Sequence, residues 1–294
     1  MKRFVIYTAI VGGYDEVHQP LIIDDRFDYI LFTDMTSEPN IGVWKVLPLP
    51  YRNGSNMVQS RFPKCNSHIV LSEYEASLWL DGTMQIASPH VYERFFEMYE
   101  AGVEWASIKH PAQDCIYEEM CAIIEMRWVT DMDVVDCYSR FKKNGFPENW
   151  GLYENNIIYR RHTHTVSQVN QEWWADLVNG GKRDQFFLMV YLRKYQPKMD
   201  YFLSNGECPR LQSKNFNYFE HNPHKRVLKL SFHEMMRFRI IRTMYPHNKR
   251  KGYHEMFDWV SRFNNPKLML SVWEILHFIK WAPKLLFTSI RNRI

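Results

Sequence analysis

The chain has 294 residues, a length that allows one large domain or one domain with an appendage. Hydrophobic residues make up 46% and charged residues 24%, which excludes disorder, collagen and a coiled coil as descriptions of the whole chain. The net charge of +4 hides an asymmetry, because residues 225–294 carry fifteen Lys or Arg against four Asp or Glu. An acidic body with a basic tail predicts that the tail meets an anionic partner.

Hydrophobic runs and turn residues predict strands that alternate with helices. Strands are expected at Phe4–Ile10, 29–33, 43–47, 77–80, Trp105–Lys109, 155–159 and 201–203. Met84–Ile86 is expected to continue the strand at 77–80. Helices are expected at 56–68 with an interruption near Pro63, and at 89–101, 117–126, 134–143, 166–179 and 184–192. This order predicts an α/β fold with a mostly parallel sheet, whose ligands bind beyond the carboxyl ends of the strands.

The composition changes near Pro223, after which the chain is basic, aromatic and helical. We therefore expect a first domain at residues 1–223 and a basic helical extension at 224–294. Within residues 268–294, Trp and other apolar residues stand among Lys and Arg, a pattern typical of a helix that lies on an anionic membrane. A helical subdomain packed on the body accounts for the pattern nearly as well. Pro283 is expected to kink or end one helix.

The compartment is inferred from what the sequence lacks. Five cysteines without a Cys-x-x-Cys pair argue against a disulfide framework and a zinc site. The first apolar run is short and ends at Gly12-Gly13, so a strand is expected there rather than a signal peptide. No apolar run reaches about 18 residues, so no transmembrane helix is expected. These features predict a cytoplasmic protein, peripheral at the inner face of the plasma membrane, with no nucleic-acid partner.

Several predicted strand ends carry residues that suit a ligand. Gly12 and Gly13 end the first strand, where glycine lets the backbone approach a ligand closely, although a plain turn explains them equally well. Asp34 ends the second strand. Asp81 follows an apolar strand and precedes Gly82, and a carboxylate there suits a divalent cation or a sugar hydroxyl, with a turn cap as the alternative. The glycine spacing matches neither a dinucleotide fingerprint nor a P-loop.

Other polar residues could reach the same edge of the sheet. Arg61 and Lys64 are three apart, on one face if helical, and could neutralise phosphate, although such pairs are often only solvated. Asp184 starts a predicted helix, either as an N-cap or as a side chain in the cleft. Glu154 and Asn155 precede a strand and suit a hydroxyl-rich ligand, although a polar turn explains them as well.

Seven ordered motifs together resemble a known family. They are Tyr-Thr-Ala-Ile-Val-Gly-Gly-Tyr-Asp at 7–15, Phe-Thr-Asp at 32–34, Arg-x-x-Lys-x-Asn-x-His at 61–68, Glu-Tyr-x-x-Ser-Leu-Trp-Leu-Asp-Gly at 73–82, Cys-Ile-Tyr-Glu-Glu at 115–119, Gly-Leu-Tyr-Glu-Asn-Asn at 151–156 and Arg-Asp-Gln at 183–185. Their order resembles the glycosyltransferase-like domain of plant seed-mucilage and pollen-turgor proteins and of bacterial polysaccharide clusters. The resemblance covers about residues 1–205 and implies a GT-A-like, nucleotide-sugar-binding α/β/α sandwich.

The resemblance also implies a role for each matching residue. Ala9, Gly12 and Tyr14 would border the nucleotide, and Asp34 would lie near its base or ribose. Arg61 and Lys64 would contact the donor phosphates. Asp81 and Gly82 would lie near the metal or the donor sugar. Asp184 would lie on the acceptor side, with His110 and Asn155 as further candidates for acceptor contact. His221, with Asp81, is the candidate metal ligand.

These expectations converge on a transferase that moves a sugar from a nucleoside-diphosphate sugar to a glycan or lipid-linked glycan, in bacterial surface polysaccharide synthesis. An inverting enzyme needs a base near the acceptor hydroxyl, and Asp184 and Glu154 are the candidates. The usual metal signature has a second acid where Thr83 stands, so the involvement of Mn²⁺ or Mg²⁺ stays open. The alternative function is a non-catalytic carbohydrate-binding or scaffold protein that keeps the fold.

Overall fold

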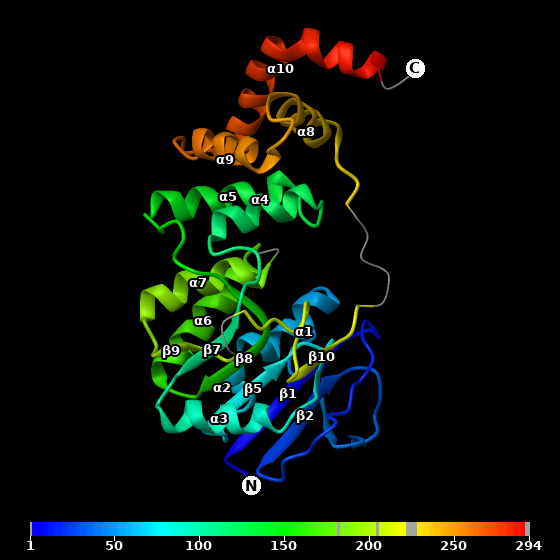
Figure 1. The fold of residues 1–294 in the computed structure, drawn as a ribbon, viewed down its shortest axis with the longest axis vertical. Coiled ribbons are helices and arrows are strands. Elements are labelled where there is room, and N and C mark those ends of the chain that lie inside the picture. The colour runs from blue at the N-terminus through cyan, green and yellow to red at the C-terminus, as the bar shows by residue number, and fades with distance from the viewer. Residues whose placement is uncertain (1, 181–182, 204–205, 222–227, 292–294) are drawn as a thin grey trace. The chain divides into compact units, whose positions relative to one another are not determined.

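The computed structural model describes residues 2–180, 183–203, 206–221 and 228–291, with side chains described as far as Lys284 (Figure 1). Chain contacts divide the protein into two compact units. The sheet unit comprises Met1–Ala112 and Leu152–Lys225, and the helical unit comprises Gln113–Gly151 and Arg226–Ile294. The predicted boundary at Pro223 lies outside the described residues. The units differ from the predicted domains in one respect, because residues 113–151 pack with the C-terminal helices.

The sheet unit contains an eight-stranded sheet with the order β3-β4-β2-β1-β5-β8-β7-β9. The strands are β1 (Phe4–Ile10), β2 (Phe27–Thr33), β3 (Asn40–Ile41), β4 (Trp44–Pro48), β5 (Ala76–Leu80), β7 (Trp105–Lys109), β8 (Tyr153–Arg161) and β9 (Met199–Tyr201). β1 runs parallel to both β2 and β5. β4 runs parallel to β2, and β9 runs parallel to β7. β8 is antiparallel to both of its neighbours, and β3 is antiparallel to β4. The predicted α/β class with a mostly parallel sheet is confirmed.

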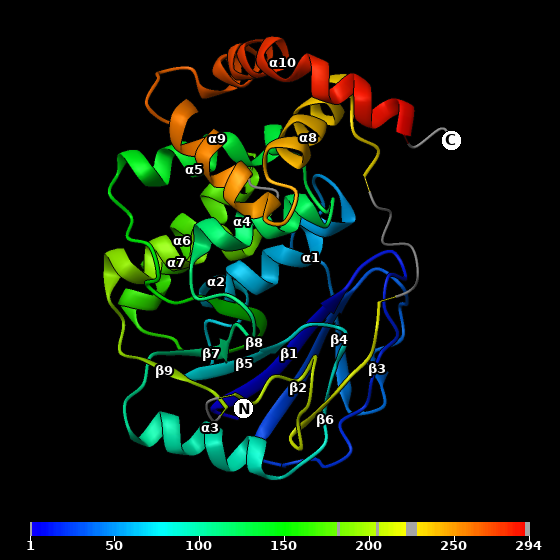
Figure 2. The ribbon, with the colours of Figure 1, turned by 45° about the horizontal axis from the view of Figure 1, so that its top comes forward.

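Helices cover both faces of this sheet. They are α1 (Asn56–Cys65), α2 (Ser67–Val70), α3 (His90–Glu100), α6 (His164–Val178) and α7 (Asp184–Tyr195). Figure 2 shows α3 on one face and α1, α2, α6 and α7 on the other. On the α3 side, Phe95 meets Phe4 and Phe27 edge to face at centroid distances of 5.4 and 4.8 Å. β1 and β5 are buried along their whole length, which explains their uninterrupted apolar sequences.

Two local expectations differ from the structure. Met84–Ile86 forms β6, which pairs antiparallel with β10 (Phe216–Tyr218) in a separate small sheet instead of continuing β5. The amide of Met84 donates to the carbonyl of Asp81, and this turn redirects the chain. The first helix continues through Pro63, and the interruption falls at Asn66, whose backbone and side-chain N–H groups both donate to the carbonyl of Phe62.

The helical unit packs five helices among the described residues. They are α4 (Ile116–Glu125), α5 (Asp131–Lys143), α8 (Phe232–Met244), α9 (Lys249–Val260) and α10 (Pro266–Arg291). A buried ion triad links three of them, because Arg237 of α8 contacts Asp131 of α5 at 2.6 and 2.8 Å and Glu274 of α10 at 3.0 Å. α10 continues past Pro283, so of the two expected effects, a kink or an end, this proline does not end the helix. Within the described part of the chain, no helix is both long and apolar enough to cross a membrane.

Candidate functional site

The carboxyl ends of three adjacent parallel strands bring the predicted glycines and carboxylates to one edge of the sheet. β2, β1 and β5 lie side by side, and they lead into Asp34, Gly12 and Asp81 respectively. The amide of Gly12 donates to Asp34 Oδ1 at 2.8 Å. Gly12 has a φ of +65°, and a Cβ there would lie 2.1 Å from the amide nitrogen of Asn56. The positive φ therefore favours glycine at the end of β1.

An ionic cluster forms beside this edge, where α1 and the start of α7 meet the end of β5. Lys64 Nζ lies 3.0 Å from Asp81 Oδ1 and 2.9 Å from Asp184 Oδ2. Arg61 Nε lies 3.3 Å from Asp184 Oδ1, and Trp79 Nε1 donates to Asp81 Oδ1 at 2.7 Å. The structure thus unites four predicted site residues, Arg61, Lys64, Asp81 and Asp184, which are up to 123 positions apart in the sequence.

Burial makes the charges of this cluster strongly dependent on one another. The side chains of Lys64 and Asp184 are 5% and 8% exposed, whereas that of Asp81 is 32% exposed. Burial by itself would raise the pKa of Asp184, but Arg61 and Lys64 outweigh it and hold the pKa well below its usual range. Burial likewise opposes the charge on Lys64, yet Asp184 and Asp81 raise its pKa. Asp184 is consequently a weak proton acceptor, and its geometry suits holding two cations in place.

The residues present do not fit the divalent cation that the family resemblance left open. The Asp81 oxygen nearest the cluster already accepts from Lys64 and Trp79, and Thr83 replaces a second acid. His221, the other predicted ligand, contacts Asp15 instead. Over the part of the chain that the structure describes, no three His, Cys, Asp or Glu side chains are grouped to hold a metal ion. Lys64 is the cation that Asp81 contacts here.

A carboxylate that the sequence analysis overlooked lies beside the Asp81-Gly82 turn. Asp15 Oδ1 is 2.8 Å from His221 Nδ1, and a Cβ on Gly82 would lie 2.9 Å from Asp15 Oδ2. The absence of a side chain at Gly82 therefore lets Asp15 approach. The ring of Tyr14 lies 5.0 Å from that of His221. The signal for Asp15 is its position two residues after the Gly12-Gly13 pair that ends the first strand.

A bulge in β8 shapes the next part of the edge. Ser107 pairs with Ile158 but Ile108 pairs with Glu154, so three residues of β8 have no partner on β7. Ser107 Oγ lies 2.7 and 2.6 Å from the carbonyl oxygens of Glu154 and Ile157, within hydrogen-bond distance of both, and so spans the bulge. Bulges commonly redirect side chains near functional sites. The carbonyl of Asn156 within the bulge accepts the amide of Asp81 at 2.8 Å, which ties the bulge to the ionic cluster.

The predicted acceptor-side residues cluster around this bulge. Glu154 Oε1 accepts from Arg210 at 2.7 Å. Asn155 is 7% exposed, and both polar atoms of its side chain are buried without a hydrogen-bond partner among the described residues. Burial, with the nearby charges of Arg210 and Arg183, lowers the pKa of His110 to about 4, so its ring is neutral at pH 7. The bulge thus holds a buried amide without a partner, that of Asn155, and a carboxylate that Arg210 already contacts, that of Glu154.

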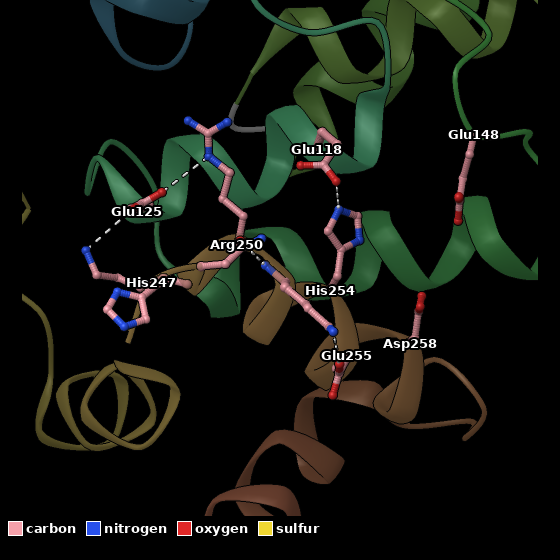
Figure 3. Close-up of a pocket in the computed structure, with 11 residues that line it drawn as sticks. Glu118, Glu125, Glu148, His247, Arg250, His254, Glu255 and Asp258 are labelled. Atoms are coloured by element: carbon pink, nitrogen blue, oxygen red, sulfur yellow. Dashed lines mark hydrogen bonds and ion pairs between the residues drawn. The ribbon is translucent and has the colours of Figure 1, made fainter. Parts of the chain in front are cut away.

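Two further observations concern Ala9 and the helical unit. Ala9 is buried within β1 and pairs with Phe32 across the sheet. In the helical unit, a cavity of about 680 Å³ is lined by charged residues of α4 and α9 (Figure 3). Lys249 and Arg250 both lie 3.3 Å from Glu125, so these charges connect the two helices to each other. No residue predicted for the site lies in that cavity.

Comparisons with known proteins found similarity to a solved structure and to a protein family. One solved structure, the apo form of the bifunctional glycosyltransferase WbbM, aligns at 9% identity and a TM-score of 0.40, over 68% of this chain and 38% of its own. No curated protein matches the sequence. Residues 1–210 match the family described as TOD1/MUCI70, glycosyltransferase-like domain. The chain therefore belongs to the TOD1/MUCI70 family of glycosyltransferase-like domains.

Proposed function

We propose that the sheet unit transfers a sugar from a nucleoside-diphosphate sugar to a hydroxyl group of a glycan or lipid-linked glycan, with a GT-A-like donor site at the edge formed by β2, β1 and β5. Family membership supports the reaction class. The observation that carries the proposal is the buried Lys64, held between Asp81 and Asp184 at the end of an apolar strand. Synthesis of bacterial surface polysaccharide is part of the same proposal.

The donor diphosphate would be neutralised by the cations of the ionic cluster. As the bond between the sugar C1 and the diphosphate oxygen breaks, the leaving nucleoside diphosphate gains negative charge, and fixed cations stabilise it. Lys64 and Arg61 are held in advance by Asp184, so little reorganisation is needed when the charge develops. The side chain of Asp81 is 32% exposed and would contact the donor sugar. In this role Asp184 positions the cations and does not take a proton.

The acceptor hydroxyl must lose a proton as its oxygen bonds to C1, and the Asp15–His221 pair suits that step better than Asp184 or Glu154. Asp15 contacts Nδ1 of His221, which leaves Nε2 as the ring nitrogen that accepts the proton. The low pKa of Asp184 makes it a poor base, and Glu154 is held by Arg210. A single displacement assisted by one base inverts the configuration at C1. Asn155 and Glu154 would then receive the hydroxyl groups of the acceptor sugar.

A panel of nucleotide sugars tests the proposal without knowledge of the acceptor, because many transferases slowly hydrolyse their donor with water. We expect one nucleotide sugar to bind and to be hydrolysed, with equal rates in EDTA and in Mn²⁺ because Lys64 supplies the cation. Binding of a donor with neither hydrolysis nor transfer to any glycan would favour the non-catalytic carbohydrate-binding alternative. Absence of binding to every donor would contradict the proposal.

A further inference from the structure

α10 is apolar on two opposite faces. The inner face packs within the helical unit, where Leu270 and Trp273 are almost fully buried. The outer face carries Leu268, Ile275 and Ile279, which are 59%, 59% and 71% exposed. These three residues are spaced by seven and four positions, so they lie along one stripe of the helix. A helix that needed only to pack on its own unit would carry polar residues along that stripe.

The charges that accompany this stripe are positive. Lys280 is exposed and follows Ile279 in the sequence, about 100° further around the helix, and the ammonium of Lys284 lies 4.6 Å from the centre of the Trp281 ring. Lys267 precedes Leu268, although Asp136 of α5 lies 2.6 Å from its ammonium. The single acid of α10, Glu274, is turned inward to Arg237. Among side chains described up to Lys284, the exposed surface of α10 is therefore apolar and cationic, without an exposed acid.

We propose that the outer face of α10 docks on an anionic lipid surface, with the helix lying along the surface. The apolar stripe would enter the boundary between headgroups and acyl chains, while Lys280 and Lys284 would meet acidic headgroups. Exposed lysines without an exposed acid on the described part of α10 also favour an anionic surface over a second copy of this helix, whose charge would have the same sign. This inference concerns the helical unit alone and does not depend on the proposed transferase activity.

Vesicle flotation of the full chain tests this surface. We expect the protein to float with vesicles of phosphatidylcholine containing roughly one third phosphatidylglycerol, and much less with pure phosphatidylcholine, with salt weakening the difference. The double variant Ile275→Asp/Ile279→Asp should bind the anionic vesicles at least about tenfold more weakly, because two apolar side chains no longer enter the lipid. Both positions are exposed, so the fold should persist, and a thermal melt checks this.

A matched control separates the helix face from general surface hydrophobicity. Ile23 of the sheet unit is 56% exposed, and Ile23→Asp should leave vesicle binding unchanged. Lys280→Glu/Lys284→Glu should weaken binding to anionic vesicles by about tenfold or more. The proposal is overturned if the wild type fails to float with anionic vesicles or if the isoleucine variant floats equally well. It is also overturned if sedimentation shows a dimer that the isoleucine variant dissociates while vesicle binding stays the same.

Discussion

Each unit of the protein buries a group of opposite charges, and the two groups are built differently. In the helical unit, the guanidinium of Arg237 contacts two carboxylates through hydrogen bonds of 2.6–3.0 Å, and the side chains of Asp131, Arg237 and Glu274 are less than one tenth exposed. In the sheet unit, Lys64 provides a point charge between Asp81 and Asp184, and Asp81 stays about one third open to solvent.

The comparison shows how a structural ion group can be distinguished from one poised for a ligand. The planar fork of an arginine fits carboxylates closely and leaves a closed triad that joins three helices. A lysine between two carboxylates leaves part of their hydrogen-bonding capacity unused. Here the carboxylate concerned is that of Asp81, at the edge of the sheet. We therefore expect changes in the triad to alter stability and changes in the ionic cluster to alter activity.

The largest effect is expected from Arg237→Met, which leaves two buried carboxylates without a cation. The free energy of unfolding of the helical unit should fall by about 3–5 kcal/mol, as measured by denaturant titration. Lys251→Met is the matched control, because its ion pair with Glu255 spans 3.9 Å at the surface, and it should cost less than about 1 kcal/mol. Equal losses in the two variants would show that the triad does not stabilise the unit.

Asp81→Asn should keep the fold while donor turnover falls about 100-fold or more. Asparagine fits a turn as well as aspartate does, but it lacks the charge that a contact to the donor and the pairing with Lys64 require. Steady-state hydrolysis of the donor, beside a thermal melt, measures both properties. A variant that melts normally and turns over like the wild type would make Asp81 a turn residue and move the active site elsewhere.

His221→Gln should lower donor turnover about ten- to hundredfold while the dissociation constant of the donor stays nearly the same, because the change removes a proton acceptor and leaves the phosphate contacts. Asp15→Asn should have a smaller effect of the same kind, since it alters only the orientation of the ring. Calorimetric binding and turnover under the same conditions separate the two quantities. A parallel loss of donor affinity would assign the pair to donor binding.

The smallest effect concerns acid stability. Because the folded pKa of Asp184 lies below its unfolded value of about 4, its charge stabilises the fold above that pH, and this contribution is lost as the pH falls further. The wild type should therefore lose more stability than Asp184→Asn between about pH 5 and pH 2, by about 1 kcal/mol or more. Parallel curves for the two proteins would mean that Asp184 is not held by its cations.

Sequence reasoning found the parts of the site that depend on short, continuous segments of the chain. A glycine turn or a carboxylate directly after an apolar strand is visible in the sequence, and parallel pairing then brings such strand ends together. The antiparallel course of β8 and its bulge depend on pairings between distant segments. The sequence could therefore indicate Asn155 as a candidate site residue, but not that its side chain lacks a hydrogen-bond partner among the described residues. Asp15 was overlooked because its partner, His221, lies 206 positions away.

The bulge that Ser107 spans also sets when the site can exist during folding. Asp81 receives its backbone contact from Asn156, and the bulge that presents this carbonyl forms only after β7 and β8 have paired. Asp184 must then arrive to place Lys64. A chain emerging from the ribosome therefore has its glycine turn and its Asp81 strand before residues 153–184 complete this edge of the sheet.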